Sequence, residues 1–255
     1  MSVQPKGRAG VVSPLTILYS PYPAALNVLI CYLVVLPVLL SAQANLFTGA
    51  SFEHEVTPRW GYEFEVEHRQ QVKSGRDNRV LLLAAVNRLL SSGLDLTTGA
   101  RLTPYYGVDP TVLRLFSDLN YRYPLVTDRL ALEARLRSQY ERNFTEAGRR
   151  NEVAVRPRLG LAVRAAAHTE MVLEAELRYR FDVYDRIVQQ RFTLGVEQLL
   201  STRIRLDTFA RMERDPGDSG SGTQPFFGVY LLYVLPDRRD RDWEYRSPFG
   251  RSLLW

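Results

Sequence analysis

The chain has 255 residues, a length that suits one or two ordinary soluble domains or a single membrane barrel. Its formal charge is +5, and because the arginines are interspersed with acids rather than gathered in runs, nucleic-acid binding has little support. Hydrophobic residues make up 45% of the sequence, a content that a barrel also has, since only every second strand residue faces lipid.

The first 44 residues have the organisation of an export signal. Two basic residues precede an apolar run, Ala24–Leu40, and the small residues Ala42 and Ala44 follow it. This order predicts a signal peptide over residues 1–44, cut after Ala44 or just after Ala42. The alternative is an uncleaved apolar helix that anchors a periplasmic domain.

The only cysteine, Cys31, lies inside this apolar run. Removal of the signal would leave a chain without cysteine, and therefore without disulfides, cysteine nucleophiles or thiolate metal sites. Because no cysteine follows a cleavage point, the sequence also excludes a lipoprotein.

Alternation of apolar and charged residues dominates the rest of the chain. In 128–142, Leu130, Leu132 and Leu136 share one parity, while arginines and glutamates occupy the other. This period of two predicts β-strands whose two faces contact different media. We expect strands at 46–56, 61–71, 79–90, 94–105, 112–123, 128–142, 151–165, 169–181, 186–198, 202–213 and 224–235.

So many alternating strands after an export signal favour an inverted arrangement, with apolar side chains toward lipid and charges inside a closed barrel. Short turns alternate with longer polar loops, which we assign to the outside. The predicted fold is therefore all-β, a single antiparallel transmembrane barrel of about ten strands over residues 45–235. Segment 46–56 is then an eleventh element, either an extra pairing segment or a strand in the lumen, unless twelve strands form with one in the charged tail 236–255. A soluble periplasmic β-sandwich is a further alternative.

The inward parity carries charged residues in which arginines on one strand face acids on the next. We expect a salt-bridged lumen, because opposite charges on adjacent strands stabilise each other. A ring of arginines that selects anions in a pore is the alternative. The predicted lumen charge network consists of Arg129, Glu133, Arg135, Arg137, Arg156, Arg158, Glu174, Glu176, Arg178, Arg180, Arg191, Arg203, Arg205, Asp207 and Arg211.

The outward parity carries aromatic residues, mostly near the strand ends. Aromatic girdles lie at membrane interfaces because the ring is apolar and its tip is polar. The predicted girdle consists of Tyr121, Tyr123, Tyr140, Tyr179, Phe181, Phe192, Phe227 and Tyr233. Core packing in a soluble sandwich would use the same residues, although with fewer charges on the opposite face.

Two patterns suggest catalysis, and neither has a companion motif. The sequence Gly-Asp-Ser-Gly at 217–220 resembles the surroundings of a chymotrypsin-like serine, but it lies in a Gly/Ser-rich loop without a histidine motif. His54, His68 and His168 are scattered, and His68 with Ser74 is the pair that a lipid-processing barrel enzyme would use. We therefore expect no catalytic residue, no metal site and no cofactor.

Several features of the chain together resemble a known family. A strand with an early aromatic residue, the run Arg129-x-x-x-Glu133-x-Arg135-x-Arg137 and a closing strand, Pro225–Leu235, look like the uncharacterised outer-membrane barrels called domain of unknown function 2490 (DUF2490). The resemblance covers residues 46–235. It implies an outer-membrane location in a Gram-negative bacterium and no established activity. The tail 236–255 departs from the pattern.

These features together predict a non-enzymatic outer-membrane barrel with a structural or interaction role. The alternatives are a small passive pore or solute channel, and an outer-leaflet lipid hydrolase or acyltransferase. The expected partners are outer-membrane lipids, lipopolysaccharide and the barrel-assembly machinery, with no nucleic acid. The sequence does not predict an oligomeric state.

Overall fold

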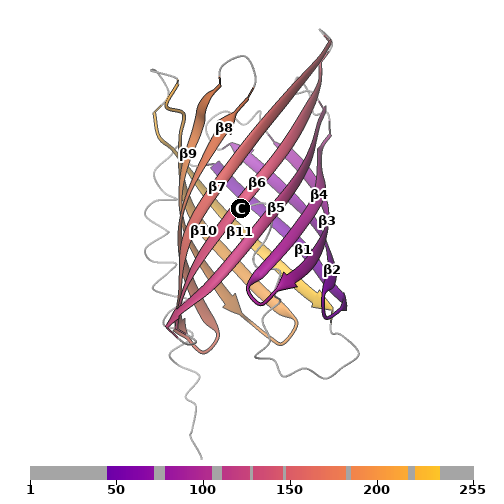
Figure 1. The fold of residues 1–255 in the computed structure, drawn as a ribbon. Helices are drawn as coiled ribbons and strands as arrows, with labels where there is room; N and C mark the ends of the chain where they lie inside the picture. The colour runs from indigo at the N-terminus through magenta and orange to yellow at the C-terminus, as the bar shows by residue number, and fades with distance from the viewer. Residues whose placement is uncertain are drawn as a thin grey trace, which may run out of the picture.

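A closed barrel of eleven strands makes up the computed structural model of this chain (Figure 1). The structure describes residues 45–71, 78–104, 111–126, 129–145, 148–181, 185–217 and 222–235. The predicted signal peptide and the tail 236–255 lie outside these ranges. In the part of the chain described, no helix has the length and apolar character needed to span a membrane.

The strands follow one another around the barrel in sequence order. They are β1 (Asn45–Thr57), β2 (Trp60–Gln71), β3 (Arg79–Ser91), β4 (Leu94–Thr103), β5 (Thr111–Val126), β6 (Leu130–Thr145), β7 (Gly148–Ala166), β8 (Thr169–Arg180), β9 (Arg186–Leu199), β10 (Ile204–Arg214) and β11 (Gln224–Leu235).

The period-two pattern of the sequence becomes the inside and outside of the wall. On β8, the outward Leu173 is 60% exposed, whereas the next residue, the inward Glu174, is 4% exposed. Successive side chains of a strand point to opposite faces, so one residue step exchanges the two environments. The apolar face is therefore the outer surface of the barrel, and the charged face lines its interior.

The barrel closes through a parallel pair, β1 with β11, whereas every other neighbouring pair is antiparallel (Figure 1). Asn45 lies opposite Phe226 and His54 lies opposite Leu235, so ten residues of β1 pair along the seam. The described barrel has eleven strands, which is close to the predicted count of about ten and one fewer than the alternative of twelve. Segment 46–56 is the core of β1 and forms part of the wall.

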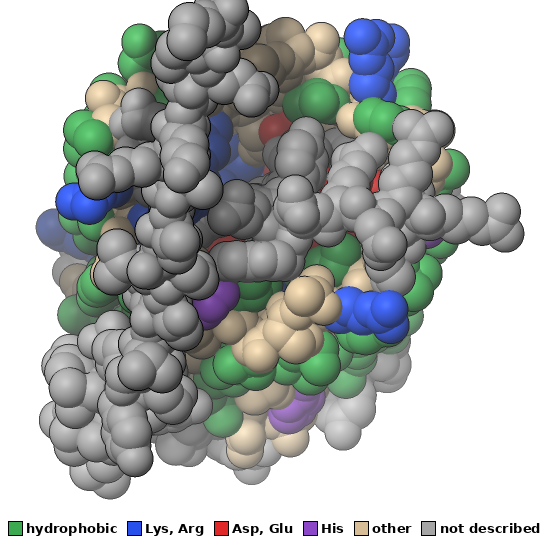
Figure 2. Space-filling view, turned by 90° about the horizontal axis from the view of Figure 1, so that it is seen from below, with side chains coloured by type: hydrophobic (Ala, Val, Ile, Leu, Met, Phe, Trp, Pro, Cys, Tyr) green, Lys and Arg blue, Asp and Glu red, His purple; other side chains and the backbone are tan. Residues whose placement is uncertain are grey.

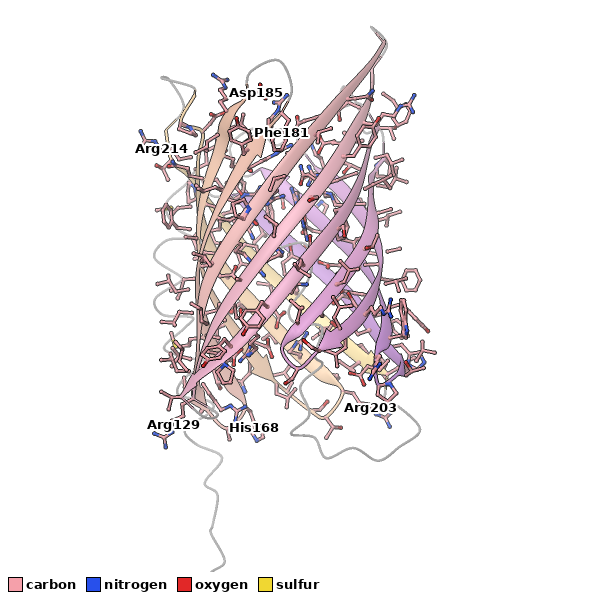
Figure 3. All side chains as sticks on the ribbon, viewed as in Figure 1. Arg129, His168, Phe181, Asp185, Arg203 and Arg214 are labelled. Carbon is pink, nitrogen blue, oxygen red and sulfur yellow. The ribbon has the colours of Figure 1, made fainter. Side chains whose placement is uncertain are left out.

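The two ends of the barrel differ in their connections. Arg129, His168 and Arg203 lie at the end formed by short turns, and Asp185 and Arg214 lie at the opposite end (Figure 3). We call these the short-turn end and the long-loop end. β1 and β11 both run from the long-loop end to the short-turn end, which makes their pairing parallel.

An aromatic cluster inside the barrel fills the space beside this seam. Phe47 on β1, Phe209 on β10 and Tyr230 on β11 are buried against one another, and the rings of Phe209 and Tyr230 stack at 5.8 Å. Gly228 lies directly opposite Phe209, and a Cβ at this position would overlap the phenyl ring. Glycine is therefore required here by close approach of a side chain rather than by backbone conformation.

Gly228→Ala is expected to destabilise the barrel by about 1–3 kcal/mol, because the added methyl group displaces a packed ring. The urea midpoint of the protein folded in lipid vesicles measures this change. Gly222→Ala is the matched control: a Cβ at Gly222 would contact nothing, so its effect should stay within about 0.5 kcal/mol. Equal midpoints for the two variants would contradict the packing assigned to Gly228.

Candidate functional site

The interior of the barrel is a charged lumen. Among the described residues, buried polar and charged side chains outnumber buried apolar ones, which reverses the arrangement of a soluble protein. Seen from the short-turn end, hydrophobic side chains surround the periphery and acidic side chains are visible within the ring (Figure 2). Buried charges are stable only when they are paired and hydrogen-bonded. The functional question is therefore which of the lumen charges pair with one another.

Glu176 on β8 is shared by three arginines from three other strands. Its Oε2 accepts a hydrogen bond from Nη2 of Arg135 on β6 at 2.5 Å. Its Oε1 accepts from Nε of Arg156 on β7 at 3.1 Å and from Nη1 of Arg191 on β9 at 3.2 Å. A single carboxylate thus ties four strands together, and Arg135 reaches it past the intervening strand β7.

Other ion pairs also span non-adjacent strands. Arg122 on β5 pairs with Glu170 on β8 at 2.9 Å, across β6 and β7. Arg205 on β10 lies 3.7 Å from Glu53 on β1, across β11. Contacts of this kind run as chords across the curved wall and connect strands that are not hydrogen-bonded to each other.

The pair Arg137–Asp118 joins two adjacent strands in bidentate geometry. Nε and Nη2 of Arg137 donate to the two carboxylate oxygens of Asp118 at 2.7 and 2.6 Å, and both side chains are buried. The guanidinium of Arg137 also lies 4.5 Å from the ring centroid of Phe116. Bidentate pairs are the strongest class of charge-assisted hydrogen bond, so this one fixes the lumen side of β5 against β6.

Tyr230 connects the two sides of the parallel seam. Its ring lies where a Cβ of Gly49 on β1 would be, and its hydroxyl donates a hydrogen bond to Glu67 on β2. Gly49 is the register partner of both Tyr230 and Glu67. The absence of a side chain at Gly49 therefore lets the tyrosine pass over β1 and link β11 to β2.

Most of the predicted lumen network lies on the strands that carry these pairs, but two of its members do not. Arg129 and Arg203 are exposed and lie in turns at the short-turn end (Figure 3). The prediction was wrong for them because β6 starts at Leu130 and β10 at Ile204, one residue beyond each arginine. The predicted members on the strands are Glu133, Arg135, Arg137, Arg156, Arg158, Glu174, Glu176, Arg178, Arg180, Arg191, Arg205, Asp207 and Arg211.

Several buried lumen charges were not among those predicted from the sequence. Glu63, Glu65 and Glu67 form an acidic ladder along β2, and Asp118 supplies the partner of Arg137. The same parity rule that selected the arginines would have selected these acids in 61–71 and 112–123. The further lumen charges outside the prediction are Glu53, Arg69, Asp95, Arg101, Arg114, Glu141, Glu152 and Glu197.

The residues of the predicted aromatic girdle lie on the outward parity, and all but one of them are exposed or partly exposed. Tyr123, Phe181 and Phe192 are 51–60% exposed, and Tyr121, Tyr140 and Tyr233 are also exposed on the outer surface. Tyr179 is partly exposed and donates its hydroxyl hydrogen bond to the backbone carbonyl of Asp185 at 2.9 Å. Phe227 differs from the expectation because it is only 3% exposed.

The candidate catalytic residues are not assembled in the described part of the chain. His54 packs against Tyr62, with ring centroids 5.3 Å apart, and His168 lies in the turn between β7 and β8. Ser74 and the serine of the Gly-Asp-Ser-Gly sequence lie outside the described residues. Within the described ranges, no group of three histidine, cysteine, aspartate or glutamate side chains could hold a metal ion.

This chain matches one family model and is similar to solved structures of porins. No curated protein matches. A structure of the NanC porin has a TM-score of 0.45 and 10% identity, covering 66% of this chain and 86% of that one. An anion-selective porin from Comamonas acidovorans has a TM-score of 0.37 and 16% identity, covering 72% of this chain and 54% of that one. A family model matches residues 44–223, so the chain belongs to the family described as protein of unknown function (DUF2490).

Proposed function

We propose that this protein is an outer-membrane β-barrel whose lumen is closed by ion pairs, and that its role is structural or interactive rather than enzymatic. The observation that carries the proposal is the sharing of Glu176 among Arg135, Arg156 and Arg191. With the chord from Arg122 to Glu170, it places long side chains across the lumen between non-adjacent strands.

The outer surface supports the membrane part of the proposal. Leu159, Leu173 and Phe192 are each 60–61% exposed on three neighbouring strands. Large contiguous apolar surfaces are costly in water and mark contact with lipid or protein. A closed barrel satisfies its backbone hydrogen bonds internally, which the bilayer interior requires. The proposed contacts are therefore outer-membrane lipids and lipopolysaccharide, with insertion by the barrel-assembly machinery.

Conductance in a planar bilayer tests the closed state of the lumen. The purified, heat-modifiable protein is expected to show little ionic current, because the chords obstruct the aqueous path. A large, steady single-channel conductance in the parent protein would contradict the closed lumen and assign the passive pore instead. A mass shift of lipid A on expression would assign the lipid-modifying enzyme.

Sidedness in the membrane is tested by single cysteines at the two ends of the barrel. Arg214→Cys, at the long-loop end, is expected to react with an impermeant thiol reagent on intact cells. Ser92→Cys, exposed in the turn between β3 and β4, should react only after the outer membrane is permeabilised. The parent protein, in which Cys31 is the only cysteine, gives the background. The reverse pattern would place the long loops in the periplasm, and labelling of both positions would contradict the membrane barrel.

A further inference from the structure

One buried arginine of the lumen makes no ion pair with an acid among the described residues. Seven arginines are buried among the described residues, and six of them make an ion pair with an acid: Arg114, Arg135, Arg137, Arg156, Arg205 and Arg211. The seventh, Arg101, is 9% exposed, and its guanidinium makes no ion pair or hydrogen bond with a described residue. Its Nε is buried and has no acceptor.

The strand register explains why Arg101 has no acidic partner among the described residues. On β4, Arg101 lies opposite Leu83 of β3 on one side and opposite Arg114 of β5 on the other. Side chains directly opposite on adjacent strands are the closest cross-strand neighbours, and here one is apolar and the other carries the same charge. Like charges in this position destabilise each other, and an anion bound between them would offset that repulsion.

The acids nearest in electrostatic effect are already engaged. Glu141 pairs with Arg114, and Glu67 pairs with Arg69 and accepts the hydroxyl hydrogen bond of Tyr230. Both glutamates act on Arg101 while each is paired with another arginine, so neither forms an ion pair with the Arg101 guanidinium. An uncompensated buried charge is costly, and an anion bound beside it removes that cost.

We infer that Arg101 binds a small anion that carries a carboxylate or phosphate group, in the half of the lumen nearer the long-loop end. The planar guanidinium presents two parallel N–H donors that match two oxygens of such a group. Arg114 and Arg69 add positive charge near this guanidinium, and each remains paired with its own glutamate. The strands of the barrel surround Arg101 and separate it from any lipid headgroup outside the wall. The ligand is therefore a small anion free in solution. This inference goes beyond the proposed function and holds whether or not the barrel conducts.

The test measures how anions stabilise the purified full-length barrel in detergent. Inorganic phosphate and acetate are titrated separately against the unfolding midpoint, followed as the shift between folded and unfolded gel bands at constant ionic strength in chloride. A ligand that binds only the folded state raises the midpoint with its concentration, which gives an apparent Kd. Response to phosphate alone assigns a phosphoryl ligand, response to acetate alone assigns a carboxylate, and response to both assigns either class.

Arg101→Gln is expected to weaken the apparent affinity by about tenfold to a hundredfold, the usual effect of losing a hydrogen-bonded charge. Arg129→Gln, which removes an exposed arginine in a turn, should leave the response unchanged. Equal responses in the parent protein and Arg101→Gln would overturn the site, as would a parent protein that responds to neither anion.

A second pair of variants keeps Arg101 and changes only its neighbour. Leu83→Glu puts a carboxylate directly opposite the guanidinium and is expected to abolish the anion response, because the internal acid takes the place of the ligand. Leu83→Gln has nearly the same shape without the charge and should retain the response. Retention in both Leu83 variants would overturn the inference even if Arg101→Gln failed to fold.

Discussion

Replacing Glu176 by alanine is expected to lower the free energy of unfolding by about 3–5 kcal/mol, the usual cost of removing one member of a buried ion pair. The three arginines that share Glu176 would all lose an acid at once, and Arg135 and Arg156 are themselves buried. Arg135 and Arg156 would then repel each other and move apart, whereas Arg191 would keep its ion pair with Glu213 at 2.9 Å. We therefore also expect an anion conductance where the parent protein has little.

Urea unfolding in vesicles and bilayer recordings measure these two effects. Glu133→Ala is the matched control, because its partner Arg122 keeps a second acid, Glu170. Since Arg122 is partly exposed, the control should cost no more than about 1 kcal/mol. Equal losses in the two variants would contradict the role of Glu176 as a shared acid. A destabilised Glu176→Ala barrel without added conductance would mean that other side chains close the lumen.

Leu173→Arg is expected to block insertion of the barrel. Leu173 lies on the outer surface of β8, 60% exposed and well inside the strand. An arginine facing the middle of the bilayer costs roughly 2–4 kcal/mol, which falls toward zero near the interfaces. The measurement is the amount of heat-modifiable protein in the outer-membrane fraction.

Leu200→Arg separates the effect of lipid from the effect of charge. Leu200 is similarly exposed, at 55%, but it lies in the connection between β9 and β10 at the short-turn end. In a soluble protein both substitutions would be harmless, because both side chains contact solvent. Normal assembly of both variants would therefore argue against a lipid-facing wall, whereas loss of Leu173→Arg alone would support it.

The strands were predictable because the two faces of the wall have different environments, and side-chain polarity therefore alternates with a period of two residues. Each expected range overlaps a strand of the structure, including the Ala- and Leu-rich 79–90, whose composition also favours helix. The number of wall strands was not predictable in the same way. The assumption that both ends of a barrel lie on one side excluded segment 46–56 from the wall, and the parallel pairing of β1 with β11 leaves no signal in the alternation of either strand.

The site was predictable in its residue types but not in its pairs. Parity alone places Arg135 and Glu176 inside, whereas their contact depends on how far the strands are staggered around the barrel. The stagger is a property of the closed wall, so sequence spacing does not contain it. Arg101 illustrates the same limit, because its lack of an acid becomes visible only when the register opposite Leu83 and Arg114 is known.

The odd strand count has a consequence for handling the protein. Because β1 and β11 run in the same direction, β1 begins at the opposite mouth of the barrel from the one where β11 ends. An epitope joined to Asn45 and another joined to Leu235 would be presented at opposite mouths of the barrel. A circular permutant that joins Leu235 to Asn45 would need a linker of about 30 Å, because Asn45 lies beside Phe226 near the start of β11. Short linkers that suit barrels with an even number of strands would therefore fail here.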